Sequence, residues 1–146
     1  MLDIPPVWLV VFLGIGKLQT SFLPLGPEAS PVVGLLAGLL VGGGIVLIAL
    51  AVLEFRKNST TIVPHQEADT LIVSGIFRRT RNPIYLADLM LLAGFLLNWS
   101  AWLSLALVPI LMWVLERRFI LPEENRLRRK FRADFARYER KTRRWV

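Results

Sequence analysis

The sequence predicts an all-α, multi-pass integral membrane protein with about four transmembrane helices. Apolar residues make up 54% of the chain and its mean hydropathy is +0.51, values that are high for a soluble domain. These residues are gathered into four stretches, and a bilayer core asks for roughly 20 apolar residues per helix. The 146 residues are therefore expected to form a single membrane domain.

The first two spans are predicted over about 6–25 and 32–55. The first is the less regular stretch, because Lys17, Gln19 and Thr20 interrupt its apolar run. The second is continuously apolar and long enough to cross a bilayer with some tilt.

Three glycines recur every four residues within the second span. Gly34, Gly38 and Gly42 are expected on one face of the helix, where the absence of side chains lets a neighbouring helix approach closely. The pattern predicts a helix-packing face.

The third and fourth spans are predicted over 83–97 and 101–115. The polar turn between them is short, so the two helices are expected to form an antiparallel hairpin. Two polar segments remain, a loop over 56–82 and a tail over 116–146.

The tail has the pattern of an amphipathic helix. Leu127, Phe131, Phe135 and Tyr138 follow one another at intervals of four, four and three residues among many arginines. Such a helix is expected to lie at the membrane surface, with its basic side chains on anionic lipid headgroups.

The basic residues predict the orientation. Of the 18 lysines and arginines, five lie in the loop, twelve in the tail, and the last is Lys17. Because basic residues beside spans stay cytoplasmic, we expect the loop and both termini on the cytoplasmic side, in a bacterial or archaeal cytoplasmic membrane. Membrane contacts account for the net charge of +7 without a nucleic acid partner, and the lack of cysteine excludes thiolate metal sites.

Asn82 and Pro83 begin the third span and permit two interpretations. Asparagine is a good helix cap and proline fits the first helical position. The same helix start, with Arg81 beside it, also offers amide groups and positive charge to a carboxylate or phosphate.

Glu123 and Glu124 are equally open to two interpretations. They are expected in the first turn of the tail helix, where acidic side chains favour the helix dipole and Glu124 can pair with Arg128. Alternatively, they bind a ligand.

The ordered set of these motifs resembles a known family. The set comprises Leu-Ile-Val-Ser-Gly-Ile-Phe (71–77), Arg-Asn-Pro-Ile-Tyr (81–85), an apolar hairpin, Glu-Glu-Asn-Arg-Leu (123–127) and a phenylalanine with a tyrosine seven residues later. It is similar to the isoprenylcysteine carboxyl methyltransferase and phospholipid methyltransferase group. The resemblance covers about 60–145 and implies an integral membrane enzyme that uses S-adenosylmethionine.

The resemblance also implies which residues bind that cofactor. The matching positions are Leu71, Ile72, Phe77, Arg81, Asn82, Pro83, Tyr85, Glu123 and Glu124. They supply the apolar, aromatic and charged groups that adenine, a sulfonium and an amino acid end require. Since the methyl group is already activated, no metal is expected.

Three positions depart from the family pattern. Asn82 replaces a histidine, which removes a titratable group. Phe119 stands where prenylcysteine enzymes have an arginine for the substrate carboxylate, although Arg118 is one residue away and is the candidate for that role. Arg132 replaces a glycine.

His65 and Asp88 are two further candidates. His65 lies in the loop where family members often place a polar cofactor contact, although an exposed histidine is the alternative. Asp88 lies one turn inside the third span on the face of Tyr85, where it is a candidate base for the acceptor, unless it is simply solvated or paired with an arginine.

The sequence therefore predicts a methyltransferase that uses S-adenosylmethionine on a lipophilic or lipid-anchored acceptor at the cytoplasmic side of the membrane. The alternative is a non-catalytic module for helix packing and lipid binding, which binds no cofactor. A small transporter is a weaker alternative, because the spans lack the repeated polar face that a conduction path requires.

Overall fold

The computed structural model describes residues 5–23, 27–28, 30–57 and 71–145, and these residues form helices and turns without a strand. The predicted all-α class is confirmed. The elements in chain order are α1 (Pro5–Phe22), α2 (Pro31–Lys57), η1 (Gly75–Arg78), α3 (Pro83–Asn98), η2 (Leu103–Ala106), α4 (Leu107–Leu115), η3 (Glu116–Ile120), α5 (Leu121–Phe131) and α6 (Ala133–Lys141).

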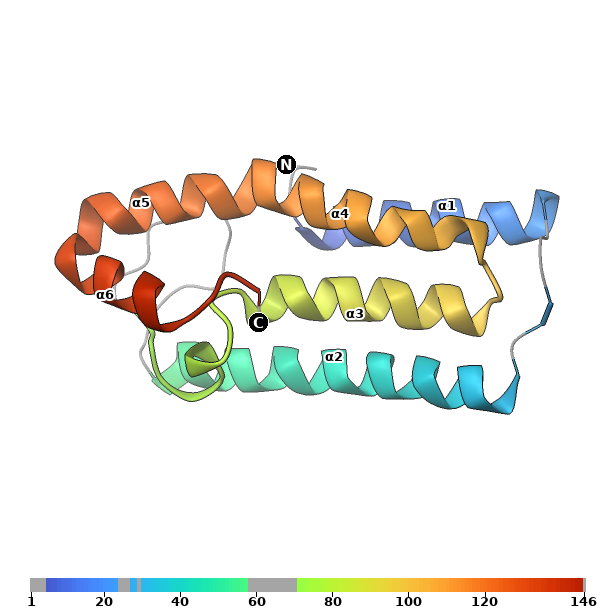
Figure 1. The fold of residues 1–146 in the computed structure, drawn as a ribbon, viewed down its shortest axis with the longest axis horizontal. Helices are drawn as coiled ribbons and strands as arrows, with labels where there is room; N and C mark the ends of the chain where they lie inside the picture. Colours follow the sequence, from blue (N-terminus) through green and yellow to red (C-terminus); the bar gives the residue numbers. More distant parts are fainter. Residues whose placement is uncertain (1–4, 24–26, 29, 58–70, 146) are drawn as a thin grey trace.

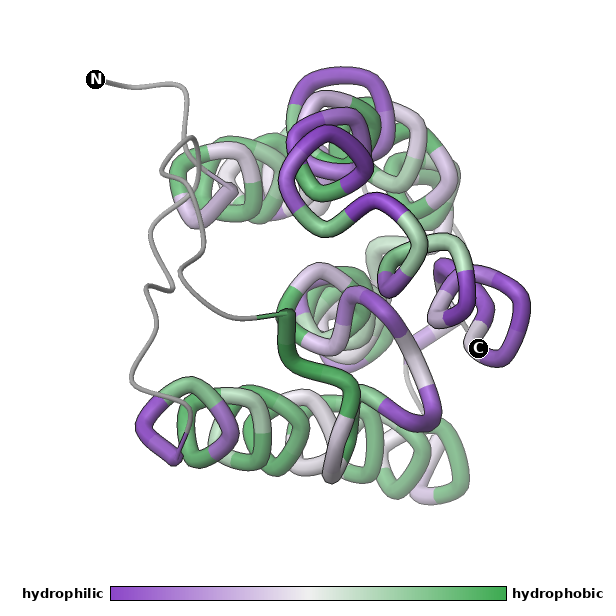
Figure 2. Tube along the Cα trace, turned by 90° about the vertical axis from the view of Figure 1, so that its left-hand side faces the viewer, coloured by the Kyte–Doolittle hydropathy of each residue, from purple (hydrophilic) through white to green (hydrophobic). Residues whose placement is uncertain are grey.

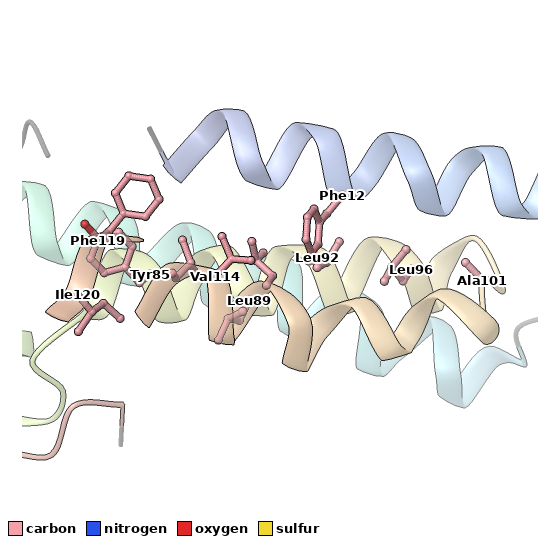
Figure 3. Close-up of a cluster of buried hydrophobic side chains, with 11 residues drawn as sticks. Phe12, Tyr85, Leu89, Leu92, Leu96, Ala101, Val114, Phe119 and Ile120 are labelled. Atoms are coloured by element: carbon pink, nitrogen blue, oxygen red, sulfur yellow. The ribbon is translucent and has the colours of Figure 1, made fainter. Parts of the chain in front are cut away.

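The long helices run side by side (Figure 1). α3 is central: α2 packs along one side of it, while α1 and α4 pack against other parts of its surface. Apolar side chains from α1, α3 and α4 fill the space between them, with Phe12, Leu92 and Leu96 among the buried ones (Figure 3). This core holds the first turn of α3 against the end of α4.

The close approach of α2 to α3 does not use the predicted glycine face. Side chains added at Gly34, Gly38 or Gly42 would meet no atom within 4 Å. Contact is made instead at Gly44, and at Gly94 of α3, where a Cβ would lie 2.9 Å from the backbone oxygen of Ala37. The prediction failed because it considered only the spacing of glycines within α2. The close contact depends instead on Gly94, a glycine of the neighbouring helix α3.

The four predicted spans correspond to helices, but only α2 among the described helices is both long and apolar enough to cross a membrane by itself. α3 is apolar and shorter, and its 16 residues extend about 24 Å at 1.5 Å each. The four-span topology therefore stays a prediction. Figure 2 shows the apolar course of α2 and the polar character of the C-terminal segments.

The tail is not one surface helix as predicted. α4, η3 and α5 continue into one another with helical backbone angles, so that one long helix reaches Phe131 (Figure 1). Arg132 then adopts φ 46° and ψ −111°, a conformation that favours glycine, and α6 turns back along the bundle. Glycine at this position in the resembling family would remove the strain that arginine carries here.

Two consequences follow for the predicted tail. Phe135 and Tyr138 are buried in one cluster with the loop residues Ile72 and Phe77, so these two side chains are covered by protein. In addition, Glu123 and Glu124 lie in the first turn of α5, as predicted, but η3 runs into α5 with helical backbone angles, so this turn is not a free helix N-terminus.

Candidate active site

A partly buried hydrogen bond joins α3 to α5 near the start of α3. The hydroxyl of Tyr85 donates to Oε1 of Glu123 at 2.5 Å. Tyr85 is 7% exposed, and its ring stacks on the fully buried Phe119 with centroids 6.3 Å apart. Figure 3 shows the two rings side by side at one end of the apolar core. A carboxylate and two aromatic faces therefore lie together at this end of the core.

The π-helical turn η3 helps to position these groups. Its wider turn brings the amide of Leu121 to the carbonyl of Glu116, five residues earlier. Single π-turns within α-helices are frequent at functional sites, because they change which side chains face inward. Here Phe119 and Ile120 face the core. The apolar and charged patterns of the sequence do not predict this turn.

Glu124, the neighbour of Glu123, is surrounded by arginines. Arg144 binds it through two hydrogen bonds, from Nε at 2.8 Å and from Nη2 at 2.9 Å. Arg81 and Arg128 lie 3.5 and 3.6 Å from its carboxylate. The hydrogen bonds to Glu124 raise the pKa of Arg144 above its ordinary value. The predicted pair of Glu124 with Arg128 is thus present, within a larger network.

Glu139 of α6 completes this ion-pair network. Arg128 binds it at 2.8 and 3.0 Å, and Arg81 lies 3.5 Å away. The hydrogen bonds from Arg128 hold the pKa of Glu139 below its ordinary value, although burial acts in the opposite sense. Charge-assisted bonds of this kind tie α6 back onto α5.

The C-terminal segment fastens to the start of α3. The Arg81 amide donates to the carbonyl of Arg143 at 3.0 Å, and the Asn82 side-chain amide donates to the carbonyl of Arg144 at 3.0 Å. Asn82 therefore does not cap α3 with its side chain, contrary to the structural interpretation of the sequence. Pro83 does occupy the start of the helix, as predicted, and is fully buried.

The loop residues predicted to bind the cofactor form a separate cluster. Ile72 and Phe77 are buried together with Ala51 of α2 and with Phe135 and Tyr138 of α6. The Tyr138 hydroxyl donates to the Phe77 carbonyl at 2.7 Å, and burial raises the pKa of this tyrosine. Leu71 packs against the edge of the cluster.

Glu54 of α2 fixes the turn at Ser74 and Gly75, which follows Leu71 and Ile72. The Glu54 carboxylate accepts a hydrogen bond from the Ser74 hydroxyl at 2.7 Å. Gly75 has φ 61°, and a Cβ there would overlap Oε1 of Glu54. Serine and glycine at 74 and 75 are thus explained by the close approach of this loop to α2.

Asp88 and Arg126 each carry a polar atom that is buried without a hydrogen-bond partner among the described residues. Asp88 is 5% exposed and lies one turn after Tyr85 on α3. Arg126 lies one turn after Glu123 on α5, and the charges of both residues act on Tyr85. Arg126 was not predicted as a site residue, although its three-residue interval from Glu123 places it on the same helix face.

Two predicted site residues remain. Arg118 is exposed, with its guanidinium 5.4 Å from the ring centroid of Trp8 on α1. His65 lies outside the described residues.

The structure thus brings six of the predicted cofactor residues to the start of α3. They are Arg81, Asn82, Pro83, Tyr85, Glu123 and Glu124. Leu71, Ile72 and Phe77 belong to the neighbouring loop cluster. Within the part of the chain that the structure describes, no group of three histidine or carboxylate side chains could hold a metal ion.

Comparison with known proteins gives one match. The model of a protein family described as phospholipid methyltransferase matches residues 32–134. No curated protein and no solved structure matches the chain.

Proposed function

Since this chain belongs to the phospholipid methyltransferase family, we propose that it transfers a methyl group from S-adenosylmethionine to a lipophilic acceptor at the cytoplasmic side of a membrane. The family match runs from α2 through the loop, α3, α4 and α5, so it includes the predicted cofactor residues from Leu71 to Glu124. The observation that carries the proposal is the hydrogen bond of the buried Tyr85 to Glu123 beside the ring of Phe119.

The side chains present fit S-adenosylmethionine. When bound, this cofactor supplies an electrophilic methyl group on a sulfonium centre. Aromatic faces and a carboxylate attract such a cation, and Tyr85, Phe119 and Glu123 provide both. The unpartnered Nε of Arg81 adds a donor for a negatively charged end.

We propose different roles for the two adjacent glutamates. Glu123 would bind the cofactor, with Tyr85 holding its carboxylate in place. Glu124 would act as a positioning residue, because its carboxylate already forms ion pairs with Arg144 and Arg81. The apolar slot for adenine would come from Leu71, Ile72 and Phe77.

Methyl transfer asks mainly for alignment, because the methyl group is already activated. The acceptor atom must lose any proton it carries, and Asp88 is the candidate to take that proton at its unpartnered Oδ2. We further propose that α1 to α4 span the membrane and that the acceptor enters sideways from it. The exposed outer face of α2, with Leu35, Leu39 and Leu53, supports contact with lipid.

Calorimetric binding of S-adenosylmethionine and S-adenosylhomocysteine to detergent-purified protein tests the proposal. We expect micromolar binding that Glu123→Gln weakens at least tenfold while the unfolding temperature changes little. Glu28→Gln is the matched control, since Glu28 follows Pro27, whose carbonyl accepts a hydrogen bond from Trp102 just after the turn that ends α3, far from the start of that helix. Equal binding by wild type and Glu123→Gln would refute the site assignment. An absence of binding in several detergents and in lipid would instead favour the non-catalytic membrane module.

A further inference from the structure

We infer that Arg144 and Trp145, in the segment that follows α6, are positioning residues for the proposed cofactor site. They would hold the helix η3–α5 at the rotation in which Glu123 faces Tyr85. The inference rests on the proposed function, because it gives both residues an effect on the binding of the same cofactor.

The two side chains bind the helix η3–α5 at two points. Trp145 donates a hydrogen bond from Nε1 to Oε1 of Glu116 at 2.6 Å. Arg144 donates two hydrogen bonds to Glu124, from Nε at 2.8 Å and from Nη2 at 2.9 Å, and its Nη1 lies 3.8 Å from Glu116. Glu116 begins η3 and Glu124 lies in the first turn of α5, so the two points enclose Glu123 in sequence.

The backbone of the same segment is bound to the residues that precede α3. The carbonyl of Arg144 accepts hydrogen bonds from the Asn82 side-chain amide at 3.0 Å and from the Thr80 hydroxyl at 3.3 Å. Tyr85 follows Asn82 by three residues, in the first turn of α3. Arg144 therefore joins the two helices of the site, because its backbone is bound to the start of α3 and its guanidinium to α5.

The direction of Glu123 depends on the rotation of its helix about the helix axis. Successive residues point about 100° apart, so a rotation by one position would turn Glu123 away from the Tyr85 hydroxyl that it binds. The π-turn η3 precedes Glu123, and a return of this turn to α-helical spacing would cause such a rotation. Contacts at Glu116, where η3 begins, and at Glu124, beyond its end, oppose that change.

Two other arginines contact Glu124 in a different way. Arg81 lies 3.5 Å from its carboxylate, farther than the hydrogen-bonding atoms of Arg144 at 2.8 and 2.9 Å. Arg128 pairs with Glu124 and Glu139, which belong to α5 and α6. Replacing Arg128 thus removes a guanidinium from the same ion-pair network but keeps the bonds that join α3 to α5. It is the comparison for an effect on stability alone.

The test is calorimetric binding of S-adenosylhomocysteine to detergent-purified Arg144→Met and Trp145→Phe, each alone and each combined with Glu123→Gln. Arg128→Met is measured beside them. Trp113→Phe is the matched control for the tryptophan, because Trp113 is 60% exposed on α4. Thermal unfolding of each variant is recorded as well, so that affinities are compared between folded proteins.

We expect Arg144→Met and Trp145→Phe each to weaken binding about fivefold, because hydrogen bonds to charged acceptors that hold the helix of Glu123 are lost. Arg128→Met and Trp113→Phe should keep the wild-type affinity, although Arg128→Met lowers the unfolding temperature. In the Glu123→Gln background, we expect a further loss below about twofold, because residues that act through one another are not additive. A general loss of stability would instead weaken binding in either background.

Wild-type affinity in either Arg144→Met or Trp145→Phe overturns the inference and leaves the proposed function standing. An equal loss in Arg128→Met overturns it too, as does a full fivefold loss added to that of Glu123→Gln, because the segment would then not act through Glu123. Should Arg144→Met not fold, Trp145→Phe decides the question, since it keeps an aromatic ring and removes the indole donor. If the wild type binds no S-adenosylhomocysteine, the inference and the proposed function both fail.

Discussion

At the residue scale, two adjacent glutamates have different surroundings. Glu123 accepts a hydrogen bond from a buried tyrosine, whereas Glu124 accepts two from Arg144 and lies near two more arginines. Successive residues on a helix point in directions about 100° apart, so neighbours in sequence need not share an environment. Glu124 therefore contributes mainly to holding the C-terminal segment.

This difference predicts that the same substitution affects cofactor binding at Glu123 and stability at Glu124. We expect Glu124→Gln to lower the free energy of unfolding by about 1.5–3 kcal/mol, because it removes charged acceptors from hydrogen bonds of Arg144. The measurement is chemical unfolding in detergent, with Glu123→Gln measured beside it. Should Glu124→Gln unfold like the wild type yet lose cofactor affinity, Glu124 would be a ligand-binding residue and our division of roles would be wrong.

At the element scale, the contact between α2 and α3 depends on individual glycines. Gly94 lies so close to α2 that a Cβ would approach the Ala37 carbonyl oxygen to 2.9 Å and a methyl group of Val41 to 2.7 Å. Gly38 on α2 faces open space. One glycine is needed for packing and the other is not, although both lie in helix interiors.

We predict that Gly94→Ala destabilises the protein by about 1–3 kcal/mol, because backbone atoms of α2 cannot yield as a flexible side chain would. Gly38→Ala is the control and should be neutral or stabilising by roughly 0.5–1 kcal/mol, since alanine favours helix more than glycine does. Both are read as shifts in unfolding temperature. Equal shifts for the two variants would mean that the helices do not pack as described.

At the scale of the whole molecule, the site forms where three distant parts of the chain meet. The start of α3, the helix η3–α5 and the C-terminal segment are joined by the bonds of Tyr85, Asn82 and Arg144. Trp145 adds a hydrogen bond to Glu116 at 2.6 Å. All of these contacts lie at one end of the bundle, and we propose that this end faces the cytoplasm.

The proposed topology predicts a simple labelling pattern. The chain has no cysteine, so single cysteines can be introduced without a background. In inside-out vesicles, we expect a membrane-impermeant maleimide to label cysteines replacing Arg79 and Lys130 but not those replacing Glu28 and Asn98. All four residues are exposed in the structure. Labelling of all four from one side would contradict the four-span arrangement.

Several features could be predicted from the sequence because they depend on local order. Apolar stretches gave the long helices near their observed positions, and Pro83 correctly indicated where α3 begins. The order of motifs from Leu71 to Tyr138 predicted the family, and the family match over residues 32–134 confirms it. Those motifs also implied that one cofactor site contains Arg81, Tyr85, Glu123 and Glu124.

Only the tertiary structure decided how these pieces fit. The π-turn, the reversal at Arg132 and the partners of Glu124 depend on contacts between segments far apart in sequence. Periodicity within a single helix cannot report them, which is why the tail was predicted as one surface helix and the glycine face as a packing face. Hydrophobic pattern and motif order determine the elements and the family, while the buried partners of each charge are determined by packing in three dimensions.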